Sequence, residues 1–256
     1  MKKLLPIPLG ILLAGCAKET GGASTPREAV ERSEWFNSWV VKDTAQVGKG
    51  SLVAWWRQAD SVYTPVIEID VVGDSAYVKY YGKVSGLLHT YFLPEGDFTK
   101  PYGDSVHIEG VVMNLGTEDE PDWQVVRATG VASTSYENPP TFTLDSVRIT
   151  FGSQDTLITD PMSLASTDEI PHLTSSDSVS ITAYATGDVV YLFHTWRGAT
   201  EEHHRVQLTD ANSYTLPAGT TQGLHWAIID VFARSTVEDT SYPYENIVWF
   251  VPYWVD

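Results

Sequence analysis

The chain has 256 residues, with 33 acidic residues against 16 lysines and arginines, and its formal net charge is −17 at pH 7. Such a surface repels phosphate groups, so the composition argues against nucleic acid as a partner. Hydrophobic residues make up 43% and aromatic residues 12% of the chain, which excludes a disordered protein and is ample for a packed core.

The first fifteen residues have the features of a secretory signal. Lys2 and Lys3 precede an apolar run over residues 4–14. This run is shorter than the ~20 residues that a helix needs to cross a bilayer. Basic residues, a short apolar segment and small residues at its end together predict a signal peptide over residues 1–15 that is removed from the mature protein.

The end of this segment, Leu13-Ala14-Gly15-Cys16, resembles the lipobox of bacterial lipoproteins. The resemblance implies cleavage between Gly15 and Cys16, acyl chains such as palmitate on Cys16, and a lipidated tether over residues 16–24. Cys16 is the only cysteine, so no disulfide can form within the chain. Ala17 resembles the class directed to the outer membrane, on its periplasmic or surface face, or to the cell membrane where the host has only one. The alternatives are an uncleaved signal and an ordinary secretory signal with a chance cysteine.

A helix start follows the tether. Thr25 can cap the helix, Pro26 takes the first helical position, and Glu28 completes a capping box. Apolar residues at helical spacing predict that this helix continues to residue 47, and a second short helix is predicted over residues 51–59.

Strand patterns occupy the next hundred or so residues. Residues 66–72 and 75–81, separated by Gly73-Asp74, predict a β-hairpin. Further strands are predicted over residues 82–93, 105–113, 123–132 and 141–151. Helices followed by an antiparallel meander predict an α+β domain over residues 25–160, with one or two helices on a curved antiparallel sheet. This order of elements resembles the architecture of NTF2-like and cystatin-like domains.

The remaining chain predicts a second domain. Residues 161–171, which are rich in proline, serine and threonine, predict a linker. Residues 172–256 contain six short strand-like segments, which is typical of an all-β sandwich. This part resembles bacterial immunoglobulin-like or fibronectin-III-like modules. The Cys…Trp…Cys core of true immunoglobulin domains is absent, so Trp196 or Trp226 is expected to fill the core instead.

One candidate metal site combines His194, Glu201 and His203. If Gly198-Ala199 forms a two-residue turn, His194 lies opposite His203 across a hairpin, with Glu201 on the same face. Two imidazoles and a carboxylate are ligands that zinc accepts. The competing interpretation is that the histidines face solvent, because no fourth ligand can be identified.

The acidic loop Glu118-Asp119-Glu120-Pro121-Asp122 is a candidate for calcium. It lacks the alternating carboxylates and the glycine turn of an EF-hand loop, which favours a solvated loop. We therefore expect no cofactor, with zinc or calcium as the alternative.

Two segments, Gly73-Asp74-Ser75-Ala76 and Gly103-Asp104-Ser105-Val106, resemble the Gly-Asp-Ser-Leu motif of serine esterases. An esterase of that kind also needs its serine at a strand-to-helix turn and a downstream Asp-x-x-His pair. Both serines here lead into predicted strands, no Asp-x-x-His pair lies near the C-terminus, and the sequence contains no Gly-x-Ser-x-Gly elbow. No catalytic residue is therefore predicted.

Four tryptophans are candidates for ligand binding, because aromatic rings stack on sugars and line apolar pockets. They are Trp55, Trp56, Trp249 and Trp254. The competing interpretation is burial in the core.

Together these features predict a lipid-anchored protein of the cell envelope with a non-catalytic binding or structural role. The first alternative is a lipoprotein that binds a small ligand or glycan through a pocket of the N-terminal domain or through exposed aromatic residues. The second is an enzyme whose site is assembled from scattered residues. The expected partners are the membrane, through the lipid anchor, and an envelope protein or glycan.

Overall fold

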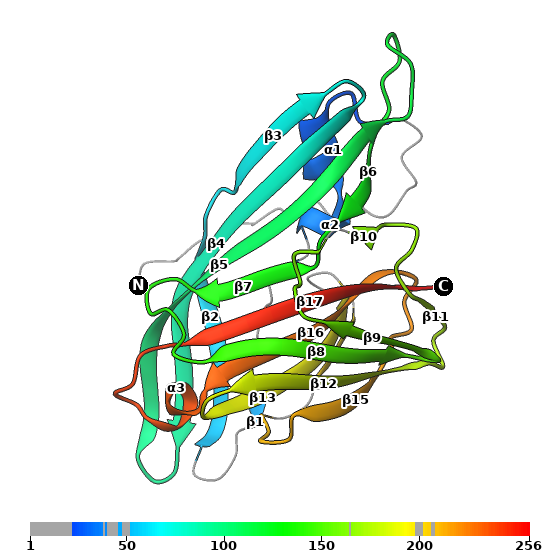
Figure 1. Ribbon diagram of the computed structural model, residues 1–256. Coiled ribbons are helices and arrows are strands. Elements are labelled where there is room, and N and C mark those ends of the chain that lie inside the picture. The colour runs from blue at the N-terminus through cyan, green and yellow to red at the C-terminus, as the bar shows by residue number, and fades with distance from the viewer. Residues whose placement is uncertain are drawn as a thin grey trace, which may run out of the picture.

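The fold of this chain is mostly β-sheet. The computed structural model describes residues 22–37, 39, 46–47, 52–163, 165–197, 202–205 and 208–256. Strand makes up 62% and helix 8% of the structure, and the strands form two sheets (Figure 1). The predicted signal peptide and the lipobox residues Gly15 and Cys16 lie outside the described residues.

The larger sheet has thirteen strands and curls on itself. Its main path runs β1-β2-β4-β5-β7-β17-β16-β13-β14, with every neighbouring pair antiparallel. These strands span Gln46–Val47 (β1), Leu52–Val62 (β2), Ser75–Phe92 (β4), Gly96–Asn114 (β5), Val131–Ser135 (β7), Asn246–Val255 (β17), Gly223–Ala233 (β16), Val189–Arg197 (β13) and Glu202–Arg205 (β14). The curl brings Arg57 of β2 to within 2.5 Å of Asp230 of β16, although β4, β5, β7 and β17 separate the two strands along the path. We call the space enclosed in this way the curl interior.

Four short strands extend this sheet off the main path. They are β3 (Val66–Val72), β6 (Trp123–Ala128), β10 (Ala165–Ser166) and β11 (His172–Leu173). The turn between β3 and β4 contains Gly73 at φ +62°, a backbone conformation that favours glycine, so the predicted hairpin is confirmed. β5 begins at Gly96 rather than at the predicted residue 105, so this strand is longer than the sequence pattern indicated.

The smaller sheet has four strands in the order β15-β12-β8-β9 and packs on one face of the larger sheet (Figure 1). They span Ser213–Pro217 (β15), Ser178–Thr186 (β12), Thr143–Phe151 (β8) and Gln154–Ile158 (β9). Val147 and Ile149 of β8 and Val179 and Ile181 of β12 form its buried inward face. The resulting sandwich takes strands from both sides of the predicted linker, and the division into two domains stays a prediction.

The described helices are short. α1 spans Pro26–Arg32, and the Thr25 hydroxyl accepts a hydrogen bond from the Glu28 backbone N–H at 3.2 Å, which confirms the predicted helix start. α2 (Glu34–Asn37) follows after Ser33, which has an extended backbone conformation, and α3 (Arg234–Glu238) follows β16.

The prediction that the first helix continues to residue 47 is wrong, because residues 46–47 form strand β1. Helices of seven and four residues near the start of the chain cannot make up a full layer, and the structure does not show the expected α+β domain.

The second predicted helix, over residues 51–59, is also wrong, because the described residues of this range, 52–59, lie in strand β2. Leu52 and Trp55 are three residues apart, a spacing that also occurs on one face of a helix. In the structure, the register with β4 shifts between Leu52 and Ala54. Such an irregularity lets Leu52 and Trp55, three residues apart, both be buried in the same core although they belong to a strand.

The central strands are buried on both faces. Every residue of β16, and every residue of β13 except the last, is buried. One face of these strands packs on the smaller sheet, and the other lines the curl interior, where Trp226 meets Trp35 of α2 edge-on at 5.6 Å. Polar residues on these strands are therefore out of contact with bulk water and need partners inside the protein.

Candidate ligand-binding site

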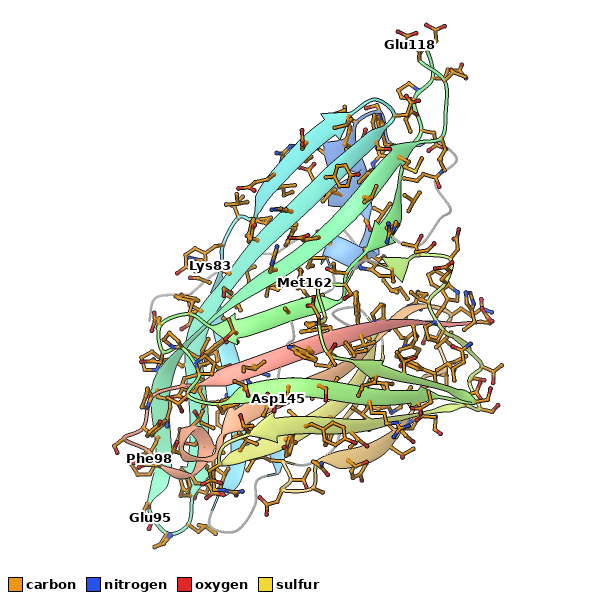
Figure 2. All side chains as sticks on the ribbon, viewed as in Figure 1. Lys83, Glu95, Phe98, Glu118, Asp145 and Met162 are labelled. Atoms are coloured by element: carbon orange, nitrogen blue, oxygen red, sulfur yellow. The ribbon has the colours of Figure 1, made fainter. Side chains whose placement is uncertain are left out.

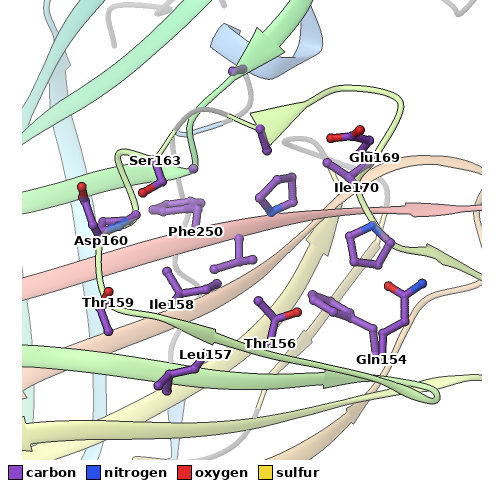
Figure 3. Close-up of a pocket in the computed structure, with 18 residues that line it drawn as sticks. Gln154, Thr156, Leu157, Ile158, Thr159, Asp160, Ser163, Glu169, Ile170 and Phe250 are labelled. Carbon is purple, nitrogen blue, oxygen red and sulfur yellow. The ribbon is translucent and has the colours of Figure 1, made fainter.

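A cavity of about 390 Å³ opens at one edge of the sandwich (Figure 3). It lies between β9, residues 159–171 and the part of β17 from Phe250 to Pro252. β7 pairs with β17 only as far as Phe250, and β11 pairs with it from Trp254 onward. The cavity therefore lies beside a part of β17 that no described strand pairs with on that side. We call it the sandwich cavity.

The polar wall of the sandwich cavity comes from the inward face of β9. Gln154, Thr156 and Ile158 lie opposite Phe151, Ile149 and Val147 of β8 in the hairpin register. Directly opposed residues share one face of a sheet, so these side chains of β9 project to the same side as the buried core of β8. Two of the three are polar, although that side of the neighbouring strands is apolar, because here they face the cavity instead of packed side chains.

The rest of the lining is largely apolar. Phe250 and Val251 come from β17 and Phe151 from the end of β8, and all three are otherwise buried. Residues 161–171, the predicted linker, contribute two prolines and Ile170. The described residues of this segment, 161–163 and 165–171, fold back over the edge of the sandwich and form one wall of the cavity (Figure 3).

Two carboxylates lie at opposite ends of the sandwich cavity, with Phe250 and Ile158 between them (Figure 3). At one end Asp160 accepts a hydrogen bond from the Met162 backbone N–H at 2.8 Å through Oδ1. At the other end is Glu169. The described lining residues include no lysine, arginine, histidine or cysteine.

The second polar cluster of the protein lies in the curl interior and is closed to solvent. Arg57 donates to Asp230 at 2.5 Å and to the Tyr244 hydroxyl at 3.1 Å, and that hydroxyl donates to Asp104 at 3.0 Å. Asn246 donates to Asp230 at 2.5 Å. Burial, and after it the Asp104 carboxylate, hold the pKa of Tyr244 well above its ordinary value.

A small cavity adjoins this cluster. It measures about 30 Å³, and its lining includes Arg57, Asp104 and Ser133. That volume suits about one or two water molecules and no organic ligand. Because the charges largely pair with one another, the cluster fits a structural role.

Lys100 also points into the curl interior, at its α3 end. Its ammonium donates to the backbone carbonyls of Thr236, Asp239 and Tyr242 at 2.7 to 2.8 Å. Burial lowers the pKa of Lys100 to about 8, against a smaller opposing effect of the Asp239 carboxylate. This lysine ties β5 to the loop that follows α3.

The predicted metal site is not assembled as expected. His194 pairs in register with Arg205, and His203 pairs with Trp196, two residues away from the predicted alignment. The interpretation that His194 faces solvent is also wrong, since it is 0% exposed, with Nε2 4.0 Å from Asp230 Oδ2. Glu201 and the side chain of His203 lie outside the described part of the chain.

Within the described residues, no three histidine, cysteine, aspartate or glutamate side chains are grouped as metal ligands. The acidic loop that was the calcium candidate projects away from the sheets, with Glu118 at its tip (Figure 2). Asn114 shapes its base by accepting hydrogen bonds from the backbone N–H groups of Gly116 and Asp122.

The four candidate tryptophans do not meet in one site. Trp55 and Trp249 are buried, with Trp55 edge-on to Phe232 at 5.4 Å. Trp56 is half-buried and stacks on His89 at 4.5 Å, and Trp254 is 38% exposed. None of the four lines the sandwich cavity.

The sandwich cavity was not predicted from the sequence. The signal for it was a pair of polar residues, Gln154 and Thr156, at alternate positions after the strand that ends at Phe151.

Comparison of the chain with protein-family models, with curated proteins and with solved structures finds no match in any of the three. Over the described residues, no helix has the length and apolar character that crossing a membrane requires. Inference about function therefore begins from the geometry of the sandwich cavity.

Proposed function

We propose that this protein is a lipid-anchored, non-catalytic binding protein of the cell envelope, and that it takes a small ligand into the sandwich cavity. The observation that carries the proposal is the cavity itself. Its volume of about 390 Å³ falls within the range of ~300–1,000 Å³ typical of ligand pockets. An apolar lining with a few polar groups at its edges is the usual composition of such pockets.

The lining supports binding rather than catalysis. It offers hydroxyls, an amide and two carboxylates, but the described part has no histidine or cysteine beside them. The carboxylates of Asp160 and Glu169 lie at opposite ends, so they do not face one another as an acid–base pair would (Figure 3). The proposed pocket thus differs from the predicted one, which was placed inside the N-terminal domain.

The anchor is proposed from the sequence. Cleavage after Gly15 and lipid on Cys16 would hold the protein on the outer membrane, facing the periplasm or the surface, or on the cell membrane of a host with one membrane. Several acyl chains make such attachment stable, because each buried methylene contributes ~0.8 kcal/mol. Mass spectrometry of the protein from its host would show an acylated N-terminal Cys16, and Cys16→Ser should release the protein from membranes.

We also propose a finer assignment of the fold. A sandwich similar to bacterial immunoglobulin-like or fibronectin-III-like modules is compatible with two facing sheets. The NTF2-like or cystatin-like resemblance of residues 25–160 has weaker support, because the helices that would carry it are short.

The test of ligand binding is a thermal-shift screen of the full mature chain against metals, glycans and small amphiphiles. A ligand at 100 times its dissociation constant adds ~2.7 kcal/mol, which raises the melting temperature of a chain of this size by several degrees. Thr156→Trp, at an exposed inward position of β9, should fill the cavity and abolish the shift. Thr215→Trp, on the outward face of the other edge strand of the same sheet, is the matched control and should leave the shift unchanged. A shift that survives Thr156→Trp would place binding elsewhere.

A further inference from the structure

Resting on the proposed function, we infer that the sandwich cavity binds an elongated organic cation. Such a ligand has an apolar middle and an ammonium group at one or both ends. The inference comes from the placement of charge, the placement of apolar surface and the size of the cavity.

The charges of the lining are all negative. Asp160 and Glu169 are its charged side chains, and neither forms an ion pair with a described residue. The hydrogen bond from Met162 occupies Oδ1 of Asp160, which leaves Oδ2 to accept from a ligand. An ammonium group beside either carboxylate gains a charge-assisted hydrogen bond, whereas an anionic ligand meets repulsion at both ends.

Apolar surface lies between the two carboxylates. Figure 3 shows Phe250 and Ile158 between Asp160 on one side and Glu169 on the other, nearer to Asp160. Alkyl or ring carbons of a ligand would cover these side chains, and an aromatic face also attracts a cation that lies over it. A neutral ligand of the same shape would take water from both carboxylates and give them no charged partner in return.

The volume limits the size of the ligand. A water molecule occupies ~30 Å³ of liquid, so 390 Å³ corresponds to roughly thirteen groups of that size. A ligand of about ten to fifteen non-hydrogen atoms would fill the cavity. Alkyl diamines and amines with eight to ten carbons have this size and this distribution of charge.

The experiment is isothermal titration calorimetry of the full mature chain in phosphatidylcholine nanodiscs, with empty nanodiscs as background. The probes share one eight-carbon chain: 1,8-diaminooctane, octylamine, 1,8-octanediol and octanedioate. We expect the diamine to bind at least about ten-fold more tightly than the diol, and the dianion not to bind. Binding of the diamine should weaken as salt is raised.

Variants of the two carboxylates test whether Asp160 and Glu169 cause the preference for the diamine. Asp160→Asn and Glu169→Gln should each weaken the diamine at least about three-fold without changing the diol. Asp168→Asn removes an exposed carboxylate next in sequence to Glu169 that does not line the cavity, and it should change nothing. All three positions are exposed, so the variants are expected to fold as the wild type does, which melting curves would verify.

The outcomes separate this inference from the proposed function. Equal affinity for the diamine and the diol, or no measurable binding of the diamine, would overturn the cation inference. If another ligand raises the melting temperature of the wild type but not of Thr156→Trp, the sandwich cavity remains a binding site, for a ligand of a different chemical class. If no ligand depends on Thr156, the proposed function fails as well.

Discussion

The curl interior and the sandwich cavity both contain polar side chains, but these side chains differ in their exposure to solvent and in their partners. In the curl interior Arg57, Asp104, Asp230, Tyr244 and Asn246 are nearly inaccessible and bond to one another. In the sandwich cavity Gln154, Thr156 and the two end carboxylates remain open to solvent. The first arrangement provides partners within the chain, and the second leaves them to be supplied from outside.

This difference distinguishes a cluster that stabilises the fold from a cavity that is available to a ligand. A buried charge needs a partner in the folded protein, because leaving it unpaired costs several kcal/mol. An exposed polar group in a cavity has water as its partner and tolerates substitution. Perturbed ionisable groups often mark functional sites, but Tyr244, whose pKa burial holds well above its ordinary value, belongs to a closed network that connects distant strands of one sheet. The open cavity is therefore the better candidate for binding, although its polar groups are only hydroxyls, an amide and two carboxylates.

The largest expected effect is that of breaking the buried ion pair. Arg57→Met leaves Asp230 without its arginine inside the curl, and we expect a loss of about 3–5 kcal/mol in the free energy of unfolding. Urea denaturation followed by circular dichroism measures this loss. Arg57→Met/Asp230→Leu should be less destabilising than Arg57→Met alone, because it removes one of the two buried carboxylates, Asp104 and Asp230, that the single variant leaves without their arginine.

The control for that loss is an ion pair outside the curl. Arg148 and Asp155 form a bidentate pair on the exposed face of the smaller sheet, with a closest contact of 2.6 Å. Arg148→Met should destabilise the protein much less than Arg57→Met does, because solvent screens exposed pairs. Equal costs for Arg148→Met and Arg57→Met would show that the curl does not depend on its buried network.

A smaller effect compares neutral polar residues in the two regions. Asn246 donates through Nδ2 to Asp230 and to the Val231 carbonyl, so Asn246→Leu should cost about 1–3 kcal/mol. Thr156→Val, at an inward position of β9, should stay within about 0.5 kcal/mol of the wild type, because water already surrounds that side chain. Melting curves of the two variants under one condition test the contrast. A large loss in Thr156→Val would mean that the cavity wall is part of the core.

Local signals in the sequence predicted local structure well. The cap at Thr25 and the turn at Gly73 act over a few residues, and both were predicted correctly. Strand β2 was predicted as a short helix, and in the structure its register with β4 is irregular. No local pattern distinguishes such a strand from a helix face when the shift depends on the partner strand.

The candidate site depended on contacts between distant parts of the chain, and these were not predictable. Residues 161–171 have the composition of a linker, yet they fold over β17, about ninety residues later, to form a wall of the sandwich cavity. His194 was expected to be exposed because strands of a sandwich usually alternate. It is buried because the curl covers the second face of β13, and that curl depends on β2 from the start of the chain.

The last expected effect concerns Lys100 and pH. Its pKa is about 8 in the folded protein, against 10.5 as its ordinary value, so between these pH values the unfolded chain holds a proton that the folded chain has released. Stability therefore rises with pH in this window, by at most about 1.4 kcal/mol per pH unit from this group. Subtracting the unfolding free energy of Lys100→Met, measured by urea denaturation at each pH, removes the titration of the tyrosines that both proteins share. A difference that grows in favour of the wild type from pH 8 to pH 10 is expected. A flat difference would mean that the three carbonyls holding the ammonium outweigh its burial, so that even this part of the curl interior keeps an ordinary lysine.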